Sequence, residues 1–165
     1  MLKYIVLGLL VLAVVVVIAV LKQKVAGKTQ AANVYYLRKA LFSAAERSFL
    51  GVLEGVLPPG VRVFGKVRLE DIFGVIKGLS RGDSQGARNR INRKHVDFLL
   101  VRTSDLAPVA GIELDDSSHD EEDRQQRDAL VDEVFKSGGL PLLHVTAQKA
   151  YNSAEIRTKL ATLLA

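Results

Sequence analysis

The sequence contains no cysteine among its 165 residues. Disulfide bonds, thiolate metal sites and zinc-finger-like sites are therefore excluded, and the composition is compatible with a reducing compartment. The sequence also has no glycine-rich phosphate loop with its lysine, and no sharp turn that exposes a nucleophilic serine. Internal repeats are missing as well. These absences favour metal-assisted hydrolysis with oxygen ligands among the catalytic chemistries.

Charge and proline are missing from Tyr4–Leu21, a run of eighteen residues with one glycine. About 20 apolar residues at 1.5 Å each span a bilayer, so this run with its flanks predicts an uncleaved transmembrane anchor. A cleaved signal peptide is the rival interpretation, although its apolar region is typically about 7–15 residues long. Lys22, Lys24 and Lys28 follow the run, which by the positive-inside rule places the carboxy-terminal part in the cytoplasm. We expect a single-pass protein of the inner (cytoplasmic) membrane.

The rest of the sequence has room for one domain. We expect residues 1–28 to form the anchor and its basic flank, residues 29–40 a linker or juxtamembrane helix, and residues 41–165 the domain. Capping, periodicity and turn signals predict helices at 43–57, from about 118 to 136, and at 153–164, and strands at 61–69, 96–101, 109–114 and 140–145. Residues 77–94 are poor in apolar side chains and predict a flexible basic loop. This order predicts an α/β fold, a small mixed sheet flanked by helices, with a parallel crossover before the last strand.

Positive and negative charges are divided unequally along the chain. Residues 22–94 carry fifteen Lys and Arg against five Asp and Glu, a balance of +10, whereas residues 95–165 carry seven against thirteen, a balance of −6. The basic half is suited to phosphates of nucleic acid or lipid, and simple solvated faces are the alternative. The candidate nucleic-acid-binding residues are Lys66, Arg88, Arg90, Arg93 and Lys94.

Two neighbouring predicted strands each carry an acid at a core-like position, Asp97 and Glu113. An unpaired carboxylate inside apolar sequence is costly, so either a metal ion or a pair of buried hydrogen-bond donors must offset it. Two carboxylates suit Mg²⁺ or Mn²⁺, which keep several waters. His119 follows at a strand-to-helix turn and is a candidate general base, although capping or packing also accounts for it. Glu46 is accounted for by a capping box with Ser43.

Four stretches together resemble a bacterial family known only as a domain of unknown function, many of whose members carry one amino-terminal membrane span. The stretches are Phe64–Ile72, Asn92–Phe98, Ile112–His119 and Arg127–Asp128. The resemblance covers about residues 41–144. That family is similar to the restriction-endonuclease-like (PD-(D/E)XK) superfamily, in particular the branch that includes very-short-patch-repair endonucleases. This similarity implies a restriction-endonuclease-like core: a helix followed by a mixed sheet with a crossover helix.

The same similarity implies roles for individual residues. Asp97 is the expected metal aspartate and Glu113 the second acid. The common pattern has a lysine two residues after the second acid, where this chain has Asp115. The short-patch-repair branch lacks that lysine and uses a histidine after the strand, for which His119 is the match. Glu46 matches an acid often found on the first helix, and these five residues form the expected catalytic set.

We therefore expect a membrane-anchored, metal-dependent nuclease that hydrolyses DNA, or less favourably RNA. One alternative is a catalytically weak nucleic-acid-binding module. Another is a membrane-associated scaffold whose acids cap helices and whose basic half touches anionic lipid.

Overall fold

A computed structural model describes residues 1–26, 34–115 and 121–165, and it divides the chain into two compact units, Met1–Lys39 and Ala40–Ala165. The first unit contains one helix, α1 (Leu2–Ala26). No helix within the described residues is long and apolar enough to cross a membrane. The transmembrane helix expected at Tyr4–Leu21 as part of the fold is therefore not found among these residues. The expected localisation at the inner membrane is not tested by the structure and stays a prediction.

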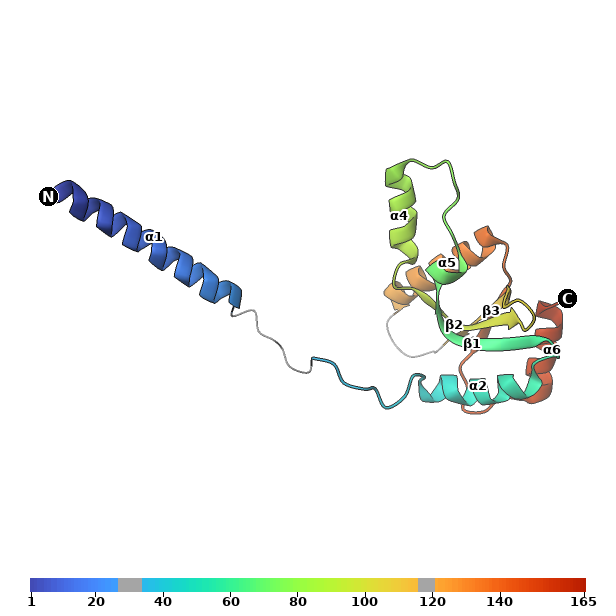
Figure 1. Ribbon diagram of the computed structural model, residues 1–165. Coiled ribbons are helices and arrows are strands. Elements are labelled where there is room, and N and C mark those ends of the chain that lie inside the picture. Colours follow the sequence, from blue (N-terminus) through green and yellow to red (C-terminus); the bar gives the residue numbers. More distant parts are fainter. Residues whose placement is uncertain (27–33, 116–120) are drawn as a thin grey trace. The chain divides into compact units, whose positions relative to one another are not determined.

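The second unit is a four-stranded mixed sheet with helices packed on it (Figure 1). Its elements in chain order are α2 (Ala44–Val56), β1 (Val61–Arg68), α3 (Leu69–Ile72), α4 (Arg81–Ile91), β2 (His95–Arg102), β3 (Pro108–Asp115), α5 (Glu121–Gly138), β4 (Leu142–Thr146) and α6 (Ser153–Leu163). The strands lie in the order β1-β2-β3-β4. Strands β1 and β3 each run antiparallel to β2, and β4 joins β3 in parallel after the α5 crossover.

The central strand β2 is buried on both faces, from Val96 to Val101. On one face, Phe98 and Leu100 pack with α2 and α6 in one apolar cluster. On the other face, Leu99 and Val101 pack in a second cluster that includes Val131 and Phe135 of α5. Such two-sided burial explains why this stretch is almost continuously apolar, and it makes Asp97 the exception within it.

Gly111 of β3 permits the close approach of α5 to the sheet. A Cβ atom at this position would lie 2.4 Å from a ring carbon of Phe135, which is itself buried. The glycine is therefore required by packing, because any side chain would displace α5 or the ring.

Two predictions about the fold need correction. The expected fold class, a restriction-endonuclease-like core with a transmembrane helix, is contradicted, and what the structure supports is a small α/β fold with a four-stranded mixed sheet and flanking helices. The stretch 77–94 is not a flexible loop throughout, because it contains the eleven-residue helix α4. Ser80 begins that helix by accepting the backbone N–H of Asp83. Only Ile91 is buried along α4, so the apolar periodicity that reveals a helix is missing there.

Candidate functional site

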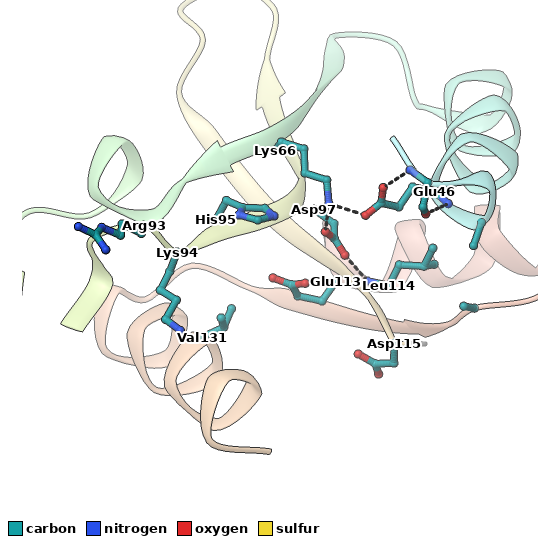
Figure 2. A pocket seen from close by; sticks show the side chains of 13 residues that line it. Glu46, Lys66, Arg93, Lys94, His95, Asp97, Glu113, Leu114, Asp115 and Val131 are labelled. Carbon is teal, nitrogen blue, oxygen red and sulfur yellow. Dashed lines mark hydrogen bonds and ion pairs between the residues drawn. The ribbon is translucent and has the colours of Figure 1, made fainter. Parts of the chain in front are cut away.

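A pocket of about 500 Å³ opens where the start of α2, the middle of β1, the start of β2 and the end of β3 meet (Figure 2). Its carboxylates come from Glu46, Asp97, Glu113 and Asp115. Its cations come from Lys66, Arg93 and Lys94, and His95 also lines it. The pocket thus gathers charged side chains that are up to 69 positions apart in the sequence, from Glu46 to Asp115.

Asp97 is the buried acid of the pocket, with 9% of its surface exposed. Its Oδ1 accepts a hydrogen bond from Lys66 Nζ at 2.8 Å, and its Oδ2 accepts one from the Leu114 backbone N–H at 3.0 Å. Burial by itself raises the pKa of Asp97, but these two donors, the charge of Lys66 and a side-chain hydrogen bond with Glu113 together bring the pKa below its ordinary value. The pair of buried donors anticipated for this acid is therefore present.

Lys66 reaches Asp97 from the neighbouring strand. Gly65 pairs with Phe98 and Val67 with Val96, so Lys66 lies opposite Asp97 in the sheet. Its backbone is left-handed, with φ at 56°, although a lysine in the middle of a strand ordinarily has extended backbone. Burial alone would lower the pKa of Lys66, but hydrogen bonds to Asp97 and Glu46 raise it overall. Lys66 is thus held as an ammonium between two carboxylates.

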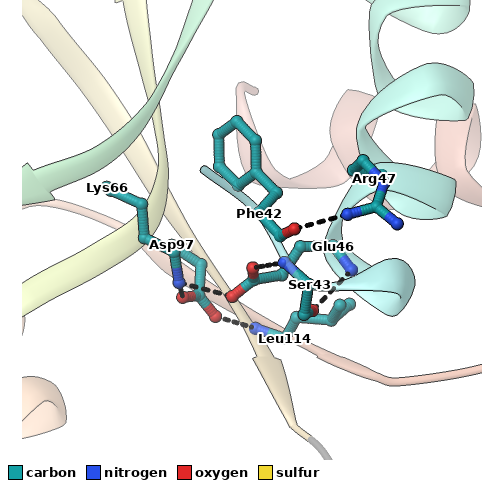
Figure 3. Close-up of polar contacts among 7 residues, drawn as sticks. All are labelled: Phe42, Ser43, Glu46, Arg47, Lys66, Asp97 and Leu114. Carbon is teal, nitrogen blue, oxygen red and sulfur yellow. Dashed lines mark hydrogen bonds and ion pairs between the residues drawn. The ribbon is translucent and has the colours of Figure 1, made fainter. Parts of the chain in front are cut away.

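Glu46 joins the first turn of α2 to this ion pair (Figure 3). Its Oε2 accepts the Ser43 backbone N–H at 2.7 Å, while Ser43 Oγ accepts the Glu46 N–H at 3.2 Å, which completes the expected capping box. The other oxygen, Oε1, accepts a hydrogen bond from Lys66 Nζ. The capping role and the role in the pocket are therefore not alternatives, because each uses a different oxygen of the same carboxylate.

Aromatic packing fixes the start of α2 over the sheet. The Phe42 ring stacks on Phe98 at 5.7 Å and covers Gly65, where a Cβ atom would lie 2.1 Å from the ring. Arg47 Nη1 donates to the Phe42 carbonyl at 2.6 Å. Gly65 therefore lets α2 approach β1 closely enough for Glu46 to reach Lys66.

At the far end of β3, Asp115 belongs to a second polar cluster that the sequence did not reveal. His144 Nδ1 lies 3.0 Å from Asp115 Oδ1, and its Nε2 lies 2.8 Å from Asp132 Oδ1 on α5. Burial lowers the pKa of His144, but the two carboxylates outweigh it and hold the pKa above its ordinary value. The parallel pairing of β3 with β4 brings this cluster together, because it sets Asp115 beside Thr146 and Glu113 beside His144. This pairing is not visible in the sequence.

The expected nucleic-acid-binding residues separate into two groups. Arg93 and Lys94 line the pocket, as does Lys66. Arg90 instead forms a bidentate ion pair with Glu133 at 3.1 and 2.7 Å, and Arg88 lies on α4 outside the pocket lining. His119, the expected general base, lies outside the described residues.

Asp97 and Glu113 are the two residues best placed to hold a divalent ion. Within the described part of the chain, no group of three or more His, Asp or Glu side chains could hold a metal ion. Mg²⁺ and Mn²⁺ need only one or two carboxylates, because waters complete their coordination. Asp97 and Glu113 line the same pocket, so the pair fits such an ion, although Lys66 already supplies a positive charge there.

Fold and site together define a small α/β protein with a buried carboxylate–lysine cluster in an open pocket. The model of a family described as "Protein of unknown function (DUF2726)" matches residues 38–163, and the chain belongs to this family. The expected membership of a family of unknown function is thus confirmed, but the match gives no link to the restriction-endonuclease-like superfamily. Comparisons with curated proteins and with solved structures gave no match.

Proposed function

We propose that this protein is a metal-dependent nuclease that hydrolyses phosphodiester bonds of DNA, with RNA as the less favoured substrate. The observation that carries the proposal is the grouping of Glu46, Lys66 and Asp97 in one pocket, with Lys66 in a left-handed backbone conformation. Sparsely populated backbone conformations persist only where the surrounding structure holds them, and they cluster at active sites. A surface ion pair would need no such conformation.

Asp97 and Glu113 would hold one Mg²⁺ or Mn²⁺ in this proposal. When bound, such an ion polarises a phosphoryl oxygen and lowers the pKa of a bound water. The Leu114 N–H fixes the Asp97 carboxylate through Oδ2, so the orientation of Asp97 does not depend on the ion.

Lys66 would stabilise the negative charge that develops on the phosphate. Its ammonium has three donors, of which Glu46 and Asp97 each accept one. The third donor is available for a phosphoryl oxygen. A fixed donor of this kind is typically worth a factor of about 10²–10³ in rate. Glu46 acts as a positioning residue because it holds the ammonium from the side of α2.

Cleavage of DNA and RNA by the full chain tests this proposal. We expect cleavage with Mg²⁺ or Mn²⁺, none with a chelator, and none by Asp97→Asn. Lys66→Met should lower the rate by about 10²–10³ while divalent-ion binding persists. Asp105→Asn is the matched control, because Asp105 pairs with Arg102 at an exposed turn. Cleavage that survives Asp97→Asn unchanged would contradict the proposal.

A catalytically weak nucleic-acid-binding module is the second candidate. One observation favours it: both oxygens of Asp97 already accept hydrogen bonds from protein donors. This candidate predicts salt-sensitive binding of nucleic acid without turnover in any divalent ion.

A further inference from the structure

Left-handed backbone recurs in the pocket. Among the non-glycine residues that the structure describes, three have positive φ: Lys66 at 56°, Arg93 at 66° and Leu106 at 59°. The first two line the pocket and are two of its three cations. Leu106 lies outside the pocket lining, between β2 and β3, where a turn alone accounts for its conformation.

The conformation of Arg93 is fixed by its backbone surroundings. It lies between α4 and β2, where the Asn92 N–H donates to Arg88 O at 2.9 Å and the Lys94 N–H donates to Ile91 O at 3.1 Å. The Leu69 N–H then donates to Lys94 O at 3.0 Å, which ties the turn to the end of β1. Glycine or asparagine is the usual residue for a left-handed position after a helix, so arginine is retained here despite its backbone cost.

Among the residues that the structure describes, Arg93 also has no ion-pair partner, unlike Arg90. Within the described residues, neither Arg93 nor Lys94 forms a side-chain ion pair, whereas both terminal nitrogens of Arg90 bind Glu133. Figure 2 shows Arg93 and Lys94 on the side of the pocket away from Glu46, with Asp97 between. An anion bound at Lys66, beside Asp97, would therefore extend towards two cations on that side.

We propose that Arg93, together with Lys94, binds the backbone phosphate next to the phosphodiester that contacts Lys66. The ligand class is a nucleic-acid strand, so this subsite rests on the proposed function. Arg93 and Lys94, in the turn that follows α4, then contact the nucleic-acid strand, whereas Arg90 on α4 does not. Arg93 and Lys66 thus both combine a left-handed backbone with a place in the pocket lining.

Salt-dependent binding of a labelled oligonucleotide to the full chain tests the subsite, measured in a chelator so that cleavage plays no part. Arg93→Gly should reduce the slope of log K against log salt by about 0.7–0.9, the value of one phosphate contact. The same variant should unfold at the same temperature as wild type or higher, because glycine adopts positive φ without cost. Arg93→Asn should give the same loss of slope, since asparagine also tolerates this conformation.

Two matched variants serve as controls. Leu106→Gly relieves a comparable backbone conformation and should leave the slope unchanged. Arg90→Gln removes one positive charge that Glu133 already neutralises and should also leave it unchanged. An unchanged slope in Arg93→Gly, or an equal loss in Arg90→Gln, would overturn the subsite.

Inorganic phosphate distinguishes a nucleic-acid strand from a free anion as the ligand. A strand-binding subsite predicts that phosphate displaces the oligonucleotide only at concentrations far above that of the oligonucleotide. Displacement at comparable concentrations would overturn it. Because binding is measured without divalent ions, a protein that binds but never cleaves would refute the proposed nuclease and leave the subsite standing.

Discussion

Asp97 is charged in the folded protein because two donors stabilise its carboxylate inside an otherwise apolar strand. Lys66 contributes a positive charge and Leu114 a backbone N–H, and both bonds are lost or weakened if the carboxylate becomes an amide. If Asp97 and a neighbouring carboxylate only repelled each other in the metal-free protein, Asp97→Asn would make the protein more stable. The two donors to Asp97 predict instead that Asp97→Asn makes the metal-free protein less stable.

We therefore expect Asp97→Asn to be less stable than wild type in a chelator, by about 1–3 kcal/mol, as is typical when a buried charge loses its partner. Equilibrium denaturation by urea measures this difference. An Asp97→Asn variant as stable as wild type would show that Lys66 does not stabilise the carboxylate. Asp105→Asn, at an exposed turn, should change stability far less.

How far individual site residues could be predicted depended on the range of the interaction. The capping box of Ser43 and Glu46 is local, and the sequence predicted it correctly. The partnership of Lys66 with Asp97 needs the strand register and a left-handed backbone, neither of which a pattern of alternating residues reveals. Lys66 was accordingly expected at a phosphate, and the structure places it between two carboxylates.

At the scale of elements, His144 links three of them. It lies on β4 and contacts Asp115 of β3 and Asp132 of α5 through its two ring nitrogens. These two carboxylates raise its pKa above the ordinary 6.5. A raised pKa means that the folded state binds the proton more tightly than the unfolded state, so protonation stabilises the fold.

The stability that His144 contributes should be fully present below about pH 6.5 and lost as the pH rises through the raised pKa. The free energy of unfolding of wild type minus that of His144→Gln, measured from pH 5 to pH 9, should therefore shrink as the pH rises. Asp132→Asn should reduce this pH dependence, because one of the two partners is removed. A difference that is constant across the range would contradict the bridging role.

Elements with an apolar stripe were predictable, whereas α4 was not. Phe49 and Leu53 mark the buried side of α2 at helical spacing, and the strands β2 and β3 follow from their apolar residues. Helix α4 has a polar surface along nearly its whole length, so only its Ser80 cap could have indicated it. The antiparallel and parallel pairings of the strands bring the residues of the pocket together. These pairings depend on contacts between distant parts of the sequence, which no local pattern reveals.

At the scale of the whole molecule, the described chain is a helical amino-terminal unit and an α/β unit that carries the pocket. The family model covers the second unit almost completely, from residue 38 to residue 163. The proposed chemistry belongs to this unit alone, because all the lining residues of the pocket lie between Ser43 and Ala147. The proposed nuclease function depends above all on the claim that Asp97 and Glu113 together hold a divalent ion.

The shift in unfolding temperature of the full chain on addition of Mn²⁺ tests that claim most directly, because an ion that binds only the folded state stabilises it by RT ln(1 + c/Kd) at ion concentration c and so raises the unfolding temperature as c increases. Wild type should show a concentration-dependent rise, which a chelator reverses. Asp97→Asn and Glu113→Gln should begin from their own baselines and show no rise, while Asp105→Asn should respond as wild type does. Asp97→Asn retaining the full Mn²⁺-induced rise would contradict the account.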